Sequence, residues 1–195
     1  CASALAQDAR LELLSRNAVW SYLDDGADLG PDWAGKADAS AWKSGPAPLG
    51  FGDEVSETDP TLPLATEVSF GGDENNKHMT TYLMTDAEFP ALDGFYGIEF
   101  YIHVDDGAVI YLNGQEIFRR GIDEGVEVGF ATGAKFKPKE ETFAISLGEL
   151  PMLKEGTNQI AVEVHQDGGD SSDLWFELGM TAITEMPDPI DWTTG

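Results

Sequence analysis

The sequence predicts an all-β fold, a jelly-roll β-sandwich of about 8–10 mostly antiparallel strands. Short apolar or alternating segments recur at intervals of roughly 8 to 20 residues, which is a spacing typical of strands in sandwiches. No helical pattern alternates with these segments, which argues against a parallel α/β sheet. The chain also contains 22 glycines and 10 prolines in 195 residues, and these supply the turns that many short strands need.

The strand pattern is carried by segments that differ in composition but share short length and clear ends. In chain order they are residues 18–24, 48–53, 65–72, 78–85, 97–106, 108–119, 141–147, 158–166 and 172–183. The first is aromatic and stops at Asp-Asp-Gly, the second follows a Gly-Pro turn, the third alternates, and the fourth is rich in Thr and Tyr. In the fifth, Phe100, Ile102 and Val104 share one face, which predicts a strand with one buried side. The last three segments follow the same pattern.

The sixth segment predicts a β-hairpin. Two apolar runs flank Asn113-Gly114, and this pair is preferred in two-residue hairpin loops because both positions need positive φ. The hairpin is the strongest local prediction in the chain.

One domain accounts for most of the chain. We expect the sandwich to cover residues 18–185, between an N-terminal tail at 1–17 and a C-terminal linker at 186–195 that contains two prolines. Within the tail, the stretch DARLELLSR predicts one or two helical turns.

The first residues resemble export signals. The small-residue stretch 4–6 followed by Gln7 is similar to the end of a secretory signal peptide, with residues 1–6 as its remnant. A second interpretation makes Cys1 the lipid-bearing first residue of a lipoprotein. Both interpretations predict a location outside the cytoplasm, either extracellular or at the cell surface.

The net charge of −25 comes from 36 acidic and 11 basic residues. It disfavours binding to nucleic acid or to an anionic membrane, because both would be repelled. No apolar run approaches the ~20 residues of a transmembrane helix, so no membrane insertion is expected. The charge is compatible with cation binding, and equally with solubility alone.

No enzyme activity is predicted. The chain has no G-x-S-x-G nucleophile elbow, no H-E-x-x-H zinc motif and no phosphate-binding loop. Pairs of carboxylates carry little information when 36 acidic residues are present.

A series of motifs resembles one recurring bacterial module. In order they are WSYLDDGADLGPDW, ASAWKSGPAPLGFGD, NNKHMTTYL, VDDGAVIYLNGQEIFR and EGTNQIAVEVHQ, followed by SSDLWFEL. Over residues 18 to 183 the chain is similar to the galactose-binding-like jelly-roll domains of secreted bacterial multidomain proteins. This resemblance implies a sandwich and a secreted setting. The VDDG element alone is also similar to the Asp-Asp-Gly loop of PA14-type adhesin domains, where paired aspartates hold calcium and the calcium holds a sugar.

Calcium is therefore the expected cofactor, with Asp105 and Asp106 as candidate ligands by the PA14 resemblance. Successive side chains of a regular strand point to opposite faces, so both could bind one ion only if the backbone kinks, which Gly107 permits. Calcium accepts such loose oxygen geometry. The alternative is an Asx-type turn in which an aspartate binds nearby backbone N–H groups.

A second candidate calcium site comes from the galactose-binding-like resemblance alone. Such folds often hold a structural calcium between an early loop and the last strand, which implies Asp25, Asp28 and Glu177 as ligands. The stretch 53–63 is predicted to be an acidic loop, and a further acidic loop at 165–173 favours ordinary turn chemistry over a metal site.

The predicted function is a non-catalytic accessory module that recognises a polysaccharide or a neighbouring domain of the same parent protein. Trp33, expected on the surface where its ring could stack on a sugar, and Asn113 are the predicted ligand-binding residues. The alternative is a structural subunit of a surface layer or fibre that self-assembles by strand exchange, for which the tail is long enough. A subdomain of an enzyme is a third interpretation.

Overall fold

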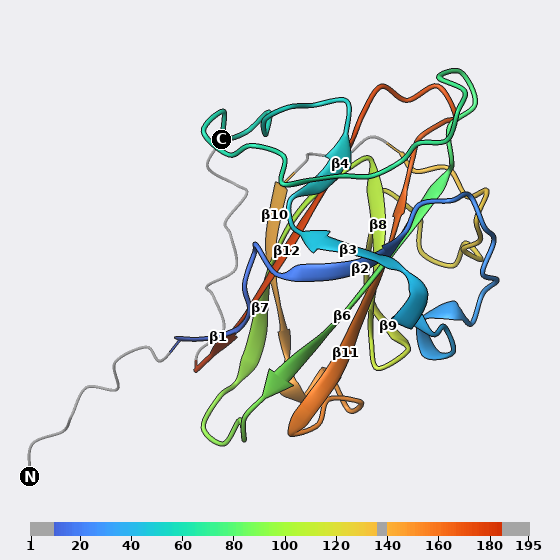
Figure 1. Cartoon of the computed structure of the whole chain (residues 1–195). Coiled ribbons are helices and arrows are strands. Elements are labelled where there is room, and N and C mark those ends of the chain that lie inside the picture. The colour runs from blue at the N-terminus through green and yellow to red at the C-terminus, as the bar shows by residue number, and fades with distance from the viewer. Residues whose placement is uncertain (1–9, 136–139, 185–195) are drawn as a thin grey trace, which may run out of the picture.

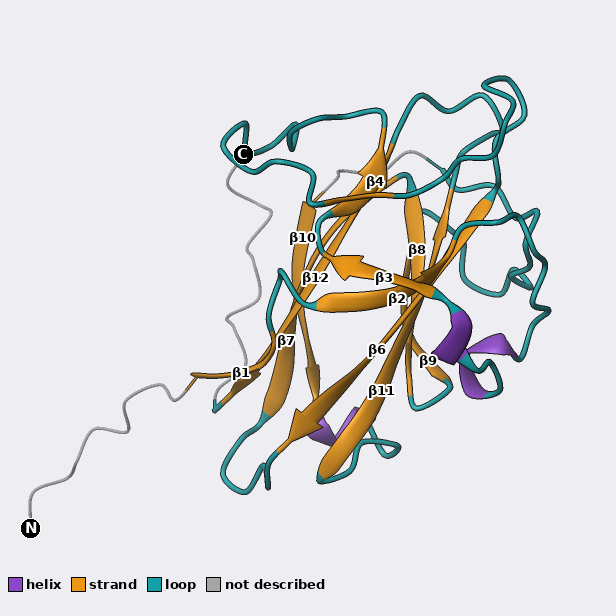
Figure 2. Cartoon of the chain, viewed as in Figure 1, coloured by secondary structure: helices purple, strands orange, loops and turns teal. Residues whose placement is uncertain are grey.

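The computed structural model describes residues 10–135 and 140–184, which fold into two β-sheets packed face to face (Figures 1 and 2). The strands are β1 (Arg10–Leu14), β2 (Val19–Leu23), β3 (Lys43–Pro46), β4 (Leu49–Phe51), β5 (Thr66–Glu67), β6 (Thr80–Phe89), β7 (Gly97–Asp105), β8 (Gly107–Leu112), β9 (Gln115–Arg120), β10 (Glu140–Ser146), β11 (Gly156–His165) and β12 (Leu174–Ile183). Three single-turn 3-10 helices accompany them: η1 (Trp33–Gly35), η2 (Ala39–Ala41) and η3 (Leu147–Glu149). The predicted β-sandwich is confirmed. The predictions for residues 1–6 and 186–195 fall outside the described residues.

Within the described residues, each sheet contains six strands. The first sheet has the order β10-β7-β12-β4-β5, with β1 also paired to β12, and the second has the order β3-β2-β6-β11-β8-β9. Among the strands that the structure describes, every pairing is antiparallel except that of β4 with β5. In the described residues no helix is long and apolar enough to cross a membrane.

The core lies between the sheets and uses the inward faces that the alternation predicts. Phe100, Ile102 and Val104 of β7 are buried in one cluster with residues of β11 from the other sheet. Trp20 of β2 meets Phe176 of β12 edge to face, with ring centroids 5.1 Å apart. These contacts join the two sheets through the largest apolar side chains.

The N-terminal stretch forms a strand, so the prediction of helical turns in DARLELLSR is wrong. β1 pairs with the end of β12, with Arg10 opposite Ile183, and it buries Leu13 and Leu14 in the core. Pairing is favoured because the edge of β12 offers backbone partners, whereas an isolated helix of one or two turns is unstable in water. β1 lies within the segment 1–17 that the sequence assigns to a tail.

The Asn113-Gly114 hairpin is confirmed between β8 and β9. Asn113 has φ 48° and Gly114 has φ 80°, as a two-residue loop of this kind requires. The side-chain amide of Asn113 forms hydrogen bonds with other parts of the domain. Its Nδ2 donates to Asn158 Oδ1 at 2.8 Å and to the Met152 carbonyl at 2.9 Å, and its Oδ1 accepts from the Gln159 N–H at 3.0 Å. These bonds tie the hairpin to the start of β11.

The chain crosses from one sheet to the other after β7 and again after β11. Both crossings lie at the same end of the sandwich. The chain passes from β7 to β8 through Asp105-Asp106-Gly107, and from β11 to β12 through residues 166–173. β4 also ends here, because Phe51 lies opposite Leu174 at the start of β12. These loops gather at the top of Figure 1. We call this the acidic end, and β1 pairs with β12 at the opposite end.

Gly50 of β4 allows the close approach of β4 to β12 that shapes the acidic end. A Cβ atom on Gly50 would lie 1.9 Å from the Leu174 carbonyl oxygen. We expect Gly50→Ala to lower the free energy of unfolding by about 1–3 kcal/mol, the usual cost of overpacking. The matched control is Gly72→Ala, because a Cβ there meets nothing within 4 Å. Urea unfolding measures both variants, and an equal loss in both would contradict the packing argument.

Candidate functional site

The acidic end contains an open hollow of about 450 Å³. It is lined by six carboxylates and two hydroxyls, from Glu57, Asp105, Asp106, Asp167, Asp170, Ser171, Ser172 and Asp173. None of these lining residues is basic. The hollow therefore concentrates part of the chain's negative charge on one end of the sandwich.

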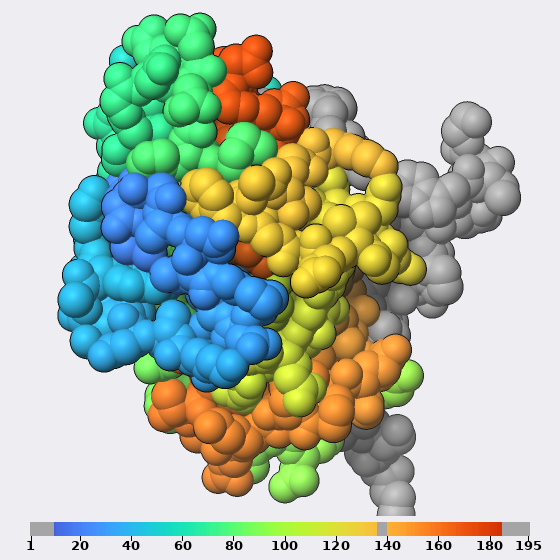
Figure 3. Space-filling model, turned by 90° about the vertical axis from the view of Figure 1, so that its right-hand side faces the viewer, coloured from blue at the N-terminus to red at the C-terminus, as the bar shows by residue number. Residues whose placement is uncertain are grey.

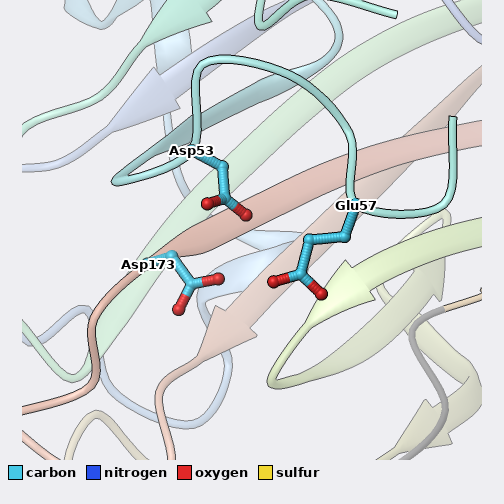
Figure 4. Close-up of side chains that lie close together, drawn as sticks. All are labelled: Asp53, Glu57 and Asp173. Carbon is cyan, nitrogen blue, oxygen red and sulfur yellow. The ribbon is translucent and has the colours of Figure 1, made fainter. Parts of the chain in front are cut away.

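Three carboxylates at this end approach one another closely enough to share a metal ion. Asp53, Glu57 and Asp173 each offer an oxygen, and these oxygens lie within 4.8 Å of one another. Figure 4 shows the three side chains turned toward a common space. In residues 10–135 and 140–184, no other group of three or more His, Cys, Asp or Glu side chains meets this condition.

Strand pairing explains why residues so far apart in sequence meet. Asp53 follows the end of β4 by two residues, and Asp173 directly precedes β12. Since Phe51 and Leu174 are opposite each other in the antiparallel β4–β12 pair, the flanking loops leave the sheet side by side. Glu57 lies farther along the loop after β4. Carboxylate oxygens on loops suit calcium, which tolerates variable geometry.

Asp105 and Asp106, the paired aspartates of the sequence prediction, line the hollow but do not belong to the group of three. Asp106 Oδ2 accepts hydrogen bonds from the Asp167 N–H at 2.8 Å and from Ser171 Oγ at 3.1 Å. Asp106 therefore fastens one crossing loop to the other, as a turn residue does. Asp105 lies opposite Trp175 in the β7–β12 ladder.

The surroundings of Asp167 in the hollow raise the pKa of its carboxyl group. Although Asp167 is exposed, partial desolvation of its carboxyl group raises the pKa, and the nearby Asp106 and Asp170 carboxylates raise that pKa further. Repulsion between like charges is thus built into the loop, and a cation in the hollow would reduce it.

Asp25 and Asp28 act as turn residues in the loop between β2 and η1, which we call the early loop. Asp25 Oδ1 accepts from the Ala27 N–H at 3.0 Å, and Asp28 Oδ1 accepts from the Gly30 N–H at 2.9 Å. These are Asx-type bonds two residues along the chain. Asp25 and Asp28 do not form a metal-sized group with Glu177.

Glu177 lies instead on the outward face of β12, where it is 2% exposed. It forms an ion pair with Arg16, and His103 Nδ1 of the neighbouring β7 lies 3.7 Å from its Oε1. The Arg16 guanidinium also stacks on the Tyr101 ring at 3.8 Å. The Glu177 carboxylate therefore links the turn after β1 to the first sheet.

The pKa of Glu177 sets a pH dependence with a definite sign. Burial alone would raise this pKa, but His103 and Arg16 outweigh burial and the pKa is lowered. A lowered folded-state pKa stabilises the protein above the ordinary value of 4.5, and this contribution is lost as pH falls through the folded-state pKa.

We expect Glu177→Gln to cost about 1–3 kcal/mol of unfolding free energy at neutral pH, because Arg16 and His103 lose their charged partner. The difference from wild type should shrink as the pH falls below 4.5. Urea unfolding at pH 7 and at about pH 3.5 measures it. A difference that stays constant with pH would show that the carboxylate charge is not what matters.

The Trp33 ring is buried, so the prediction that it lies on the surface is wrong. It is 3% exposed and packs against Tyr82, with ring centroids 4.7 Å apart, and against Tyr111 at 5.9 Å. These rings form a second apolar cluster with the loop residue Ile122. The early loop, blue in Figure 3, and the yellow segment after β9 lie side by side over this face. They cover the ring because the outward positions of β6 and β8 are apolar here.

No motif in the sequence joins Asp53, Glu57 and Asp173 into one group. The available signal was the presence of two acidic loops, at 53–63 and 165–173. Only the pairing of β4 with β12 shows that these loops meet.

Comparison with known proteins identifies similar folds but no family. No protein-family model and no curated protein matches the chain. A beta-glucuronidase from an uncultured Clostridium sp. matches with TM-score 0.53 and 16% identity, over 94% of this chain and 30% of that chain. A calcium binding mutant of Bacteroides uniformis beta-glucuronidase 2 matches with TM-score 0.51 and 16% identity, over 89% and 18%. A beta-glycosidase from Bacteroides vulgatus matches with TM-score 0.52 and 14% identity, over 88% and 20%.

The chain thus spans less than a third of the length of each of these enzymes. At such low identities the likeness shows the β-sandwich fold alone. The resemblance to galactose-binding-like modules remains a prediction of the sequence.

Proposed function

We propose that this chain is a non-catalytic accessory module of a larger, exported carbohydrate-active protein, in which it recognises carbohydrate or a neighbouring domain. One observation carries the proposal: the fold match covers about nine-tenths of this chain but only 18% to 30% of each glycosidase. A sandwich of this kind therefore recurs as one part of larger carbohydrate-active enzymes. The signal-like first residues favour export.

The second part of the proposal is that calcium binds at the acidic end. Asp53, Glu57 and Asp173 supply the clustered oxygens, and Asp105 and Asp106 border the same end of the sandwich. A divalent ion there reduces repulsion among carboxylates that the fold forces together. It also connects the loop after β4 to the start of β12. Calcium binding is stated in the name of one protein of similar fold.

Calorimetric titration of chelator-treated protein tests the calcium site. We expect calcium to bind more tightly than magnesium, since magnesium demands a stricter octahedral geometry. Asp173→Asn should weaken calcium binding at least tenfold, whereas the matched control Asp28→Asn, in the early loop, should leave it unchanged. Calcium binding that is lost in Asp28→Asn and kept in Asp173→Asn would move the site to the early loop.

The alternative of a self-assembling structural subunit makes a different prediction. β1 is a short strand near the start of the chain, and within the described residues it pairs only with β12. Exchange of β1 between copies would give chains of linked sandwiches. Sedimentation velocity distinguishes the two functions. A concentration-independent monomer agrees with the accessory module, and long polymers favour the structural subunit.

A further inference from the structure

A groove of about 390 Å³ lies on the outer face of the second sheet, apart from the acidic end. It is lined by residues of β2, β6, β11 and the η2 turn, namely Val19, Ser21, Ala37, Asp38, Ala39, Ser40, Met84, Thr85, Asp86 and Gln159. Its volume lies within the range of small-molecule sites. Nothing in the sequence motifs pointed to this groove.

Strand register places the key side chains in two neighbouring rows on one face. Ser21 of β2 lies opposite Met84 of β6, and Asp86 of β6 lies opposite Gln159 of β11. Met84 packs in the outer cluster with Trp33, so positions 84 and 86 both point away from the core. The groove is therefore an outward surface of the sheet, bounded on one side by the η2 turn.

The chemistry of the lining is mixed in the way that a sugar ring requires. Val19, which is 59% exposed, offers an apolar surface to the C–H groups of a pyranose, and Met84, which is only 6% exposed, also lines the groove. Ser21, Asp86 and Gln159 offer hydroxyl, carboxylate and amide groups to its hydroxyls. Within the described residues, the side chains of these three make no hydrogen bond of their own, so they can bind a ligand without breaking an internal contact.

The charge of the residues that line the groove determines which class of sugar it can bind. Among the described residues, Asp38 and Asp86 are the only charged ones that line the groove, and the whole chain carries −25. The Asp38 carboxylate accepts a hydrogen bond from the Ser40 N–H at 2.9 Å, and the backbone and side chain of Ser40 lower its pKa. With two carboxylates and no basic partner, a uronic acid would be repelled.

We propose that this groove binds neutral pyranose rings of a polysaccharide and excludes uronic acids. The inference rests on the proposed accessory function and names its ligand class. Apolar contact with the exposed Val19 side chain positions the ring, and Asp86 and Gln159 select its hydroxyls. The specificity thus differs from what the names of the similar glucuronidases would suggest.

Affinity gel electrophoresis followed by calorimetry tests this proposal. The neutral probes are xyloglucan, laminarin and galactomannan, and the acidic probes are alginate and polygalacturonate. We expect binding to at least one neutral glycan and no retardation by the acidic ones. Gln159→Ala and Asp86→Ala should each weaken that binding at least tenfold, and Ser21→Trp should abolish it by filling the groove.

Matched controls separate a lost contact from a lost fold. Gln115→Ala, at the start of β9 and outside the groove lining, should bind as wild type does. Each groove variant should keep its melting temperature within a few degrees and keep its response to calcium. Acidic glycans that bind as well as neutral ones, neutral binding that is insensitive to all three groove variants, or no neutral binding at all would each overturn the inference. The calcium titration is independent of the groove, so the two proposals fail separately.

Discussion

Calcium is expected to raise the melting temperature of the wild-type protein by roughly 5–10 °C relative to the same protein in chelator. A ligand that binds only the folded state, at a hundredfold excess over its dissociation constant, adds ~2.7 kcal/mol. For a domain of this size each kcal/mol corresponds to ~2–4 °C. Differential scanning calorimetry at fixed high sodium chloride measures the shift while general charge screening is held constant.

A variant at the acidic end should change two quantities in different ways: the shift in melting temperature caused by calcium, and the melting temperature in chelator. Asp173→Asn should lose most of the calcium shift because one of three clustered carboxylates is gone. In chelator the same variant should melt no lower than wild type, because one repelling charge has been removed. Magnesium is the ionic control. If magnesium stabilises as much as calcium, or if Asp173→Asn keeps the whole shift, the acids at this end are turn residues only.

Trp33→Ala is expected to lower the free energy of unfolding by about 3–5 kcal/mol, the cost of removing a buried aromatic side chain. The ring is 3% exposed and contacts Tyr82, Tyr111 and Trp42, with centroids 6.4 Å apart in the last pair. Chemical denaturation monitored by near-UV circular dichroism measures the loss.

Trp42→Ala is the matched control for Trp33→Ala. Trp42 is only half-buried at the edge of the same cluster, so its truncation should cost clearly less. Near-equal losses would show that the cluster does not depend on Trp33. A stable Trp33→Ala variant that has lost glycan binding would restore the surface role that the sequence suggested.

The strands could be predicted because their signals are local. Alternation at Phe100, Ile102 and Val104 marks one buried face whatever the partner strand, and Asn113-Gly114 specifies its hairpin through its own backbone preferences. β1 could not be predicted, since its polar–apolar alternation runs over only four residues, breaks at Leu14, and is completed as a strand by pairing with β12. Its conformation depends on a tertiary contact that the local sequence does not encode.

The site residues were harder to predict for the same reason. Pro31, Asp32 and Gly35 around Trp33 have the composition of a surface turn, yet the turn folds down onto apolar outward positions of the second sheet. The sequence does show that acids are concentrated on loops. It does not show that the loops beginning at Asp53 and ending at Asp173 meet, because that depends on which strands are neighbours in the sheet.

The position of a bound calcium ion shows whether Asp53, Glu57 and Asp173 form a metal site. Crystals grown with calcium and measured at long wavelength give an anomalous difference map that locates the ion without prior assumptions. We predict one strong peak at the acidic end, within about 2.3–2.6 Å of oxygens from Asp53, Glu57 and Asp173. A peak in the loop of Asp25 and Asp28, or a map without any calcium peak, would show that the three carboxylates do not bind calcium.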